Sequence, residues 1–294
     1  MKVLNFGSLN IDYVYRVPHL VKPGETLASI SLKIFAGGKG ANQSVALALA
    51  GAQVTHAGKI GKEGAWLLKK LADAGVDSQL VTQSESNNGH AIIQVDDHGE
   101  NAIILFAGAN QETTEKEIDR ALERSEKGSM LLLQNEINLI PSIIEKAKRR
   151  GLKICFNPAP MSAEVKKYPL QAIDLLVMNQ TEGATLVGEG SPKEILRKLT
   201  TAFPLAEIIL TLGGEGVLYQ HKETYHQIPA IPVKAVDTTA AGDTFIGYFL
   251  AFYLEKKPVR ECLTIASTAA AICISRSGAQ DSIPRRLEVL SWKH

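Results

Sequence analysis

Short apolar runs alternate with amphipathic stretches along most of the chain, and this alternation constrains the fold more than any other feature of the sequence. The apolar runs are continuous, which is typical of strands that are buried on both faces. We expect strands at residues 3–6, 54–57, 130–133, 154–156, 175–178 and 208–212, and helices at 41–50, 65–74, 140–150 and 192–201. This succession predicts an α/β fold, with a doubly wound, mostly parallel sheet that carries helices on both faces.

Two regions depart from this alternation. Residues 12–35 and 89–106 contain Val- and Ile-rich segments with no helical pattern between them, and a turn signal, Asp-Asp-His-Gly, occupies residues 96–99. We expect a hairpin around this turn, and one small antiparallel sheet formed by both regions. Such a small β-sheet would suit a lid over a ligand cleft, within a single domain that spans residues 1–294.

Composition excludes several classes of protein. Of the 294 residues, 45% are hydrophobic, which is enough for a large core and excludes a disordered chain. The net charge of +1 offers no whole-chain attraction to nucleic acid or to an anionic membrane. No apolar run approaches the ~18 residues of a membrane span. Because Cys155, Cys262 and Cys273 lie among apolar neighbours without metal or redox spacing, we expect reduced, buried thiols in a soluble cytoplasmic protein.

A glycine-rich segment occupies residues 36–43, with the sequence Ala-Gly-Gly-Lys-Gly-Ala-Asn-Gln. Its three glycines would let the backbone approach a ligand closely, and the next residues would open a helix whose N–H groups point outward. The alternative is a plain tight turn before a helix. The GxxxxGK[ST] and GxGxxG patterns are absent from the chain, which argues against a Walker A loop and a dinucleotide-binding fingerprint.

A second segment, residues 237–245, follows a strand-like stretch at 231–236 and opens a strongly apolar helix. The small residues Ala240, Ala241 and Gly242 would leave bare N–H groups at the helix N-terminus, where they and the helix dipole stabilise an anion such as a phosphoryl group in transfer. Asp243 stands next to this anion hole. It is either a helix cap or a base that accepts the proton of an attacking hydroxyl, and the small neighbours favour the base.

Further polar residues follow predicted strands. Glu136 comes shortly after the strand at 130–133, and Asn179 and Glu182 follow the strand at 175–178. Since ligands bind at the carboxyl ends of parallel strands, these residues together predict one polar cleft. The last predicted strand contributes Thr211, Gly213, Gly214 and Gly216 to it.

With these motifs the chain resembles the PfkB family of carbohydrate kinases over nearly its whole length, and within the family it is most similar to the ribokinases. The resemblance rests on the residues at 7–12 (Gly-Ser-Leu-Asn-Ile-Asp), 37–43, 157–160 (Asn-Pro-Ala-Pro), 179–182 (Asn-Gln-Thr-Glu), 211–216 (Thr-Leu-Gly-Gly-Glu-Gly) and 237–243 (Asp-Thr-Thr-Ala-Ala-Gly-Asp).

The resemblance implies a ribokinase-like fold and a role for each matching residue. Asp243 would be the catalytic base beside the sugar, with Ala240, Ala241 and Gly242 as the anion hole. The sugar would be bound by Asn10, Asp12, Gly38, Lys39, Gly40, Asn42 and Glu136. The nucleotide would be bound by Asn179, Thr211, Gly213, Gly214, Gly216, Gly242 and Ser267.

The resemblance also implies ATP, Mg²⁺ and K⁺ as cofactors. Glu182 matches the motif glutamate that is associated with Mg²⁺ through water. Two loops would enclose the monovalent cation, several of their residues through backbone carbonyls, so that the cysteine need not be a thiol ligand. The matching residues are Asp237, Thr239, Cys273, Arg276, Gly278 and Ser282.

The implied activity is an ATP-dependent sugar kinase, with phosphorylation of D-ribose at O5 as the best single match. Residues 246–249 (Ile-Gly-Tyr-Phe) are bulkier and more apolar than the usual ribokinase pattern, and Gln94 interrupts an apolar strand of the lid. Fructose, deoxyribose or a nucleoside such as adenosine therefore remain alternative substrates. A sugar-phosphate kinase is disfavoured because the motif segments supply only Lys39 as a cation.

Two other classes of function stay open beside the kinase. A non-catalytic sugar sensor on the same fold conflicts with an intact Asp243 and anion hole, and a nicotinamide oxidoreductase conflicts with the missing GxGxxG pattern. A lid of few strands would leave exposed edges and an apolar face, which the pairing of two lids would cover. A homodimer through the lid sheets is therefore expected, with no nucleic-acid or membrane partner.

Overall fold

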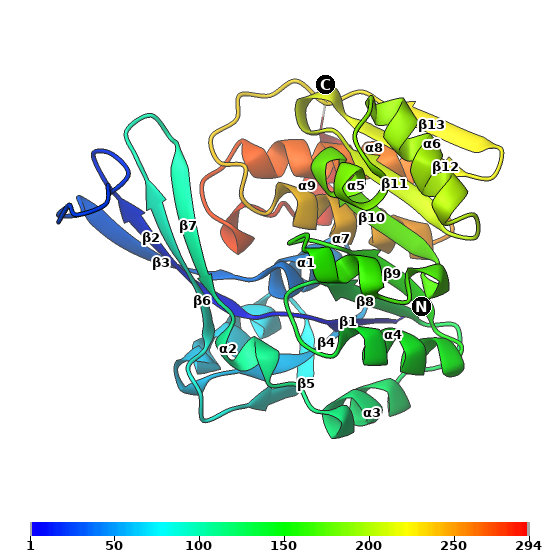
Figure 1. Ribbon diagram of the computed structural model, residues 1–294, viewed down its shortest axis with the longest axis horizontal. Helices are drawn as coiled ribbons and strands as arrows, with labels where there is room; N and C mark the ends of the chain where they lie inside the picture. Colours follow the sequence, from blue (N-terminus) through cyan, green and yellow to red (C-terminus); the bar gives the residue numbers. More distant parts are fainter. Residues whose placement is uncertain (1, 293–294) are drawn as a thin grey trace.

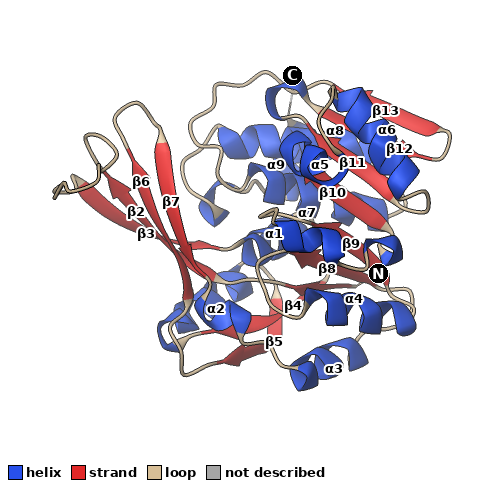
Figure 2. Ribbon diagram, viewed as in Figure 1, coloured by secondary structure: helices blue, strands red, loops and turns tan. Residues whose placement is uncertain are grey.

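The computed structural model describes residues 2–292, and the predicted doubly wound sheet is confirmed. Its nine strands have the order β13-β12-β11-β10-β9-β8-β1-β4-β5 (Figures 1 and 2). All neighbours pair in parallel except for the two pairs made by β12, which are antiparallel. The strands are β1 (Val3–Phe6), β4 (Val54–Ile60), β5 (Asp77–Gln83), β8 (Met130–Gln134), β9 (Lys153–Asn157), β10 (Leu175–Asn179), β11 (Glu207–Thr211), β12 (Val217–His221) and β13 (Thr224–Ile228).

Helices cover both faces of this sheet. Because neighbouring residues of a strand point to opposite faces, Val3 belongs to one hydrophobic cluster and Leu4 to the other. The first cluster packs under α1 (Lys39–Leu49), α2 (Ala65–Asp73), α7 (Ala241–Leu254) and α8 (Val259–Ile274), with α9 (Arg286–Ser291) beside α8. The second packs under α3 (Glu115–Glu123), α4 (Ile140–Arg149) and α6 (Pro192–Ala202), and α5 (Gln180–Val187) lies next to α6.

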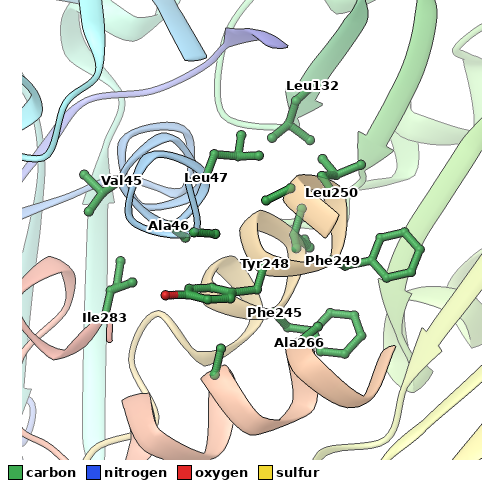
Figure 3. Close-up of a cluster of buried hydrophobic side chains, with 14 of the residues drawn as sticks. Val45, Ala46, Leu47, Leu132, Phe245, Tyr248, Phe249, Leu250, Ala266 and Ile283 are labelled. Carbon is green, nitrogen blue, oxygen red and sulfur yellow. The ribbon is translucent and has the colours of Figure 1, made fainter. Parts of the chain in front are cut away.

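Helices α1 and α7 approach each other unusually closely. Gly247 on α7 lies against Ala46 of α1, and a Cβ at position 247 would overlap the Ala46 side chain. Around this contact Leu47 of α1 points to the side of Leu250 of α7, whereas the Tyr248 ring lies by Ala46 and points toward Ile283 (Figure 3). The absence of a side chain at position 247 therefore lets the two helices pack backbone to backbone, which brings the start of α1 next to the start of α7.

The two regions outside the β-α alternation form a separate sheet with the order β3-β2-β6-β7, which projects from the body of the molecule (Figure 1). Its strands are β2 (Asn10–Arg16), β3 (Ser31–Gly37), β6 (Gly89–Val95) and β7 (Asn101–Phe106). The hairpin of β6 and β7 forms as predicted, but the sheet is not purely antiparallel. Strands β2 and β6 pair in parallel, because both leave the large sheet in the same direction and are joined through α1, β4, α2 and β5.

One predicted strand does not form. Residues 231–236 make an extended loop instead, and Pro232, which has no N–H, lies within it. At the end of this loop the Val236 amide donates to the Ile274 carbonyl at 2.7 Å. The segment is therefore fixed to the end of α8 rather than to the sheet.

Within residues 2–292 no helix combines the length and the apolar character that crossing a membrane requires. The three cysteines are free and buried, as the sequence predicted.

Candidate active site

A cleft of about 460 Å³ opens at the carboxyl ends of the parallel strands and extends under the small sheet. It lies at the point where the strand order reverses, since β1 has β8 on one side and β4 on the other. The small sheet contributes an apolar wall that includes Ala91, Ile93, Ile103 and Leu105. Fourteen predicted site residues line the cleft: Asn10, Asp12, Gly38, Lys39, Asn42, Glu136, Asn179, Glu182, Thr211, Thr239, Ala240, Ala241, Gly242 and Asp243.

The N-terminus of α7 faces this cleft without a side-chain cap. Its N-cap residue, Ala240, has left-handed backbone angles (φ 61°), and no side chain hydrogen-bonds to the helix terminus. The amide of Ala241 donates to the Thr238 carbonyl at 3.3 Å. The Gly242 amide has no such partner within residues 2–292, and a Cβ at Gly242 would meet open space. An anion at this point would therefore meet a bare N–H group and the positive end of the helix dipole.

Asp243 lies buried one residue further along α7, and its carboxylate does not cap the helix. Oδ2 accepts a hydrogen bond from Asn42 Nδ2 at 3.0 Å, and Oδ1 accepts one from Gln43 Nε2 at 2.9 Å. Both donors lie within the first five residues of α1, which the close packing at Gly247 holds against α7. The carboxylate is thus fixed in orientation at the edge of the cleft, beside the Gly242 amide.

Asn42 also has an unused hydrogen-bonding atom. Its side chain is 5% exposed, and its Oδ1 has no partner among the described residues. A buried, unpaired acceptor is costly unless a ligand supplies the donor. Asn10 is complementary, because its Oδ1 already accepts from Asn110 Nδ2 at 2.7 Å, so that its amide N–H groups remain for a ligand. The cleft therefore offers both an acceptor and a donor for hydroxyl groups.

The N-terminus of α1 differs from that of α7, and here the sequence expectation is wrong. Its amides do not point outward to a ligand. Glu136 Oε2 accepts from Lys39 N at 2.9 Å, Ser8 Oγ accepts from Gly40 N at 3.2 Å, and the Ser8 carbonyl accepts from Ala41 N at 2.9 Å. The glycines serve the protein's own packing, since a Cβ at Gly40 would overlap the backbone of Gly7 and Ser8.

Several carboxylates, among them those of Asp12, Glu136 and Asp243, crowd one part of the cleft. Burial, with like charge on Glu136 and Asp243, raises the pKa of Asp12 to about 7. Burial also raises the pKa of Glu136 above its usual range, against the effect of nearby Lys39. The Lys39 pKa is raised in turn, mainly by the charge of Asp243. Lys39 is therefore a firmly charged ammonium group that partly offsets the charge of the acids around it.

The residues assigned to the nucleotide divide into two groups. Asn179 and Thr211, at the ends of β10 and β11, line the cleft. The glycines at 213, 214 and 216 lie in the turn between β11 and β12, outside the lining, and Cβ atoms at Gly213 and Gly214 would meet open space. Ser267 is on α8, also outside the cleft lining. Gly213 and Gly214 in this turn are exposed to solvent.

The position of Glu182 suits the expected contact with Mg²⁺ through water. It forms a capping box at the start of α5, where its Oε2 accepts from Asn179 N at 2.9 Å. Its other oxygen has no hydrogen-bond partner within the part of the chain that the structure describes, and the residue lines the cleft. Burial raises the pKa of this carboxyl. One free carboxylate oxygen suits a water of hydrated Mg²⁺ better than a direct cage. No cluster of three or more His, Cys, Asp or Glu among residues 2–292 could hold a metal directly.

The two loops assigned to the monovalent cation lie side by side behind the anion hole. Asp237 joins them, because its carboxylate accepts from Thr239 N at 2.9 Å and from Gly278 N at 3.1 Å. Oxygen atoms of Asp237, of the loop backbone and of Ser282 suit a hard cation such as K⁺. The Arg276 side chain does not fit this set, because it pairs with Glu288. The Cys273 thiol contacts Ser282 Oγ at 3.0 Å and the Thr239 carbonyl at 3.7 Å.

Sequence reasoning missed the residues that lie behind the base. Gln43, Gln134 and Asn157 are buried, and all three belong to one hydrogen-bonded group with Asp243. Gln43 and Asn157 lie in motifs of the chain without an assigned role, and for Gln134 the signal was polarity in apolar surroundings, since it ends the run Met-Leu-Leu-Leu-Gln of β8. That signal does not say which partner a side chain meets across the fold.

The chain is similar to sugar kinases over its full length. A family model described as pfkB family carbohydrate kinase matches residues 1–286. A ribokinase of Haemophilus influenzae is 37% identical, over 97% of this chain and 96% of the relative. A deoxyribokinase of Salmonella typhi is 32% identical, over 97% of this chain and 96% of the relative. The solved structure of Arabidopsis thaliana ribokinase complexed with ribose and ATP has a TM-score of 0.84 and 28% identity, and covers 99% of both chains.

Proposed function

The chain belongs to the pfkB family of carbohydrate kinases, and from this premise we propose that its cleft transfers the γ-phosphoryl group of ATP to O5 of D-ribose. The single observation that supports this reaction best is Asp243, a buried carboxylate held by two amides next to the bare N-terminus of α7. A proton acceptor and an anion-stabilising site lie together there, as phosphoryl transfer to a hydroxyl requires.

In the proposed reaction Asp243 accepts the proton of the sugar's primary hydroxyl as that oxygen attacks the γ-phosphorus. The O–P bond to the sugar forms while the bond to the leaving ADP breaks. Charge that develops on the transferred group faces the Gly242 amide and the dipole of α7. Glu182 would hold hydrated Mg²⁺ through water, and the ion would supply charge neutralisation on the phosphates.

The sugar is recognised by the groups on the opposite side of the base. Asn42 Oδ1 accepts from one hydroxyl, and the Asn10 amide donates to another. Asp12 lies beside them with a raised pKa, so that near neutral pH it can accept from a hydroxyl or donate to one. Sugar hydroxyls match this mixture of donors and acceptors, and the higher identity to a ribokinase (37%) than to a deoxyribokinase (32%) favours ribose over deoxyribose. Fructose and nucleosides are the remaining alternatives.

The small sheet acts as a lid in this proposal. Its apolar wall over the cleft would exclude water from the phosphoryl group when a sugar is bound, which prevents wasteful hydrolysis of ATP. The strand β7 is exposed along its whole length, and Leu32, Ile34, Ile104 and Phe106 are among the exposed apolar side chains of the sheet. Pairing of two small sheets would cover this surface, which supports a homodimer. We also propose a cytoplasmic location, where the three buried thiols stay reduced.

Two measurements test the proposal. A coupled assay of ADP release across ribose, deoxyribose, fructose and adenosine should give the highest kcat/KM with ribose, and a higher value with deoxyribose would move the assignment to that sugar. Asp243→Asn should lower kcat at least about 10²-fold in a folded protein. Near-normal turnover of this variant would remove the base from the proposal.

A further inference from the structure

A group of buried amide side chains connects the base to the interior of the large sheet. Gln43 Nε2 donates to Asp243 Oδ1 at 2.9 Å, and Gln43 Oε1 accepts from Gln134 Nε2 at 2.6 Å. Gln134 Nε2 also donates to Asn5 Oδ1 at 3.0 Å. Gln43, Gln134 and Asn5 are each 0% exposed, so water cannot replace these bonds.

Backbone carbonyls fix the direction of every amide in this group. Asn5 Nδ2 donates to the Gly40 carbonyl at 2.7 Å, and a carbonyl can only accept. Asn5 must therefore present its oxygen to Gln134, which must present its nitrogen to both Asn5 and Gln43. As a result Gln43 is left with its nitrogen toward Asp243, the orientation that a carboxylate requires.

A second carbonyl fixes the same orientation independently. Asn157 Nδ2 donates to the Val177 carbonyl at 2.9 Å, so that Asn157 Oδ1 faces Gln43 Nε2 at 3.3 Å. The arrangement persists although it leaves Gln134 Oε1 without a partner among the described residues. An unpaired buried acceptor is unfavourable, but turning the Gln134 amide over would set its oxygen against the oxygens of Asn5 and Gln43.

We propose that Gln43 is a positioning residue for Asp243, and that Gln134 and Asn5 hold the Gln43 amide in the only orientation that serves the base. This inference rests on the proposed role of Asp243. If the Gln43 amide turned over, its oxygen would face Asp243 Oδ1, and two acceptors would repel each other. The carboxylate would then leave the line of attack on the sugar hydroxyl. Asn42 fixes the other carboxylate oxygen but borders the sugar, whereas Gln43 acts from inside the protein.

Three variants test whether the orientation of the Gln43 amide matters for kcat. Gln43→Met keeps the length of the side chain and removes the bond to the base, and we expect kcat to fall about 10- to 100-fold with both KM values within about twofold. Gln134→Met should lower kcat less, about three- to tenfold. Gln134→Glu replaces the donor by an acceptor, favours the reversed Gln43 amide, and should lower kcat at least as much as Gln43→Met.

The double variant separates positioning from general loss of stability. Since Gln134 acts on the base only through Gln43, Gln43→Met with Gln134→Met should have the kcat of Gln43→Met alone. Ser44→Ala is the matched control, because it removes a buried hydrogen bond from Asn5 Nδ2 (2.8 Å) on the far side of the group. It should lower the melting temperature, followed by circular dichroism, and leave kcat within twofold.

The outcomes distinguish this inference from the proposed function. If Asp243→Asn is inactive while Gln43→Met keeps kcat within twofold, Gln43 has no positioning role and the base assignment stands. Losses that multiply in the double variant would also overturn the inference, because Gln134 would then act by another route. If Asp243→Asn turns over normally, the base assignment fails and the inference fails with it. Should Gln43→Met not fold, the comparison of Gln134→Glu with Gln134→Met decides the orientation argument.

Discussion

Asp12 should destabilise the folded protein at neutral and alkaline pH, because the cleft holds its carboxylate where the charged form is unfavourable. Burial, then the charges of Glu136 and Asp243, raise its pKa from 3.8 to about 7. In the unfolded chain the group ionises freely at its ordinary pKa. The cost of Asp12 is therefore absent below about pH 3.8, grows as pH rises toward 7, and is complete above pH 7.

The size of this cost follows from the shift. About three pKa units at 1.36 kcal/mol each correspond to about 4 kcal/mol above pH 7. Asp12→Asn keeps the shape of the side chain and removes the charge. The variant should therefore gain stability over the natural protein as pH rises, by about 2 to 3 kcal/mol between pH 5 and pH 8.

Urea unfolding without sugar or ATP, at pH 5, 6, 7 and 8, measures this difference directly. Asp73→Asn serves as the control, since Asp73 lies in an exposed ion pair with Lys69, and its stability difference should change much less with pH. The same Asp12→Asn variant should bind the sugar more weakly, with a sugar KM raised about tenfold or more and a smaller change in the KM for ATP. A stability difference for Asp12→Asn that does not vary with pH would refute the reasoning.

Two further predictions concern charge elsewhere in the protein. Burial lowers the pKa of His56 from 6.5 to about 4, so that the folded protein loses stability as pH falls below 6.5. In urea unfolding between pH 7 and pH 4.5, His56→Gln should therefore reduce the decrease in the free energy of unfolding. The same substitution at the exposed His98 should leave this decrease unchanged. If K⁺ binds beside Asp237, replacing a large organic cation by K⁺ at constant ionic strength should raise kcat, and Asp237→Asn should remove most of this activation; an equal rate with both cations would contradict the site.

The fold was predictable where burial leaves a simple pattern in the sequence. The strands at 3–6 and 130–134 are buried on both faces and read as continuous apolar runs. The edge strand β5, Asp-Ser-Gln-Leu-Val-Thr-Gln, is only partly buried and carries no such run, so it escaped prediction. Residues 231–236 have the apolar composition of a strand, but they lie beyond the sheet and form an extended loop.

The residues of the candidate site were predictable where each of them belongs to a motif that is local in the sequence. Asp12, Asn42 and Asp243 come from three separate motifs and meet in one cleft. The direction of pairing in the small sheet was not predictable, because an alternating pattern indicates a strand and says nothing about its partner. The contact of Gln43 with Asp243 joins residues 200 positions apart, and no local pattern encodes such a distance.

That separation has a consequence for the protein during its synthesis. Helix α1 leaves the ribosome early, whereas α7, which covers it at Gly247, follows about two hundred residues later. Until then the face of α1 around Ala46 and Leu47 is not covered by α7, and Asp243 is not yet in place to accept the hydrogen bonds of Asn42 and Gln43. An incomplete chain can therefore begin to form the sheet but cannot yet use ATP. Phosphoryl transfer becomes possible only when the final helices are in place.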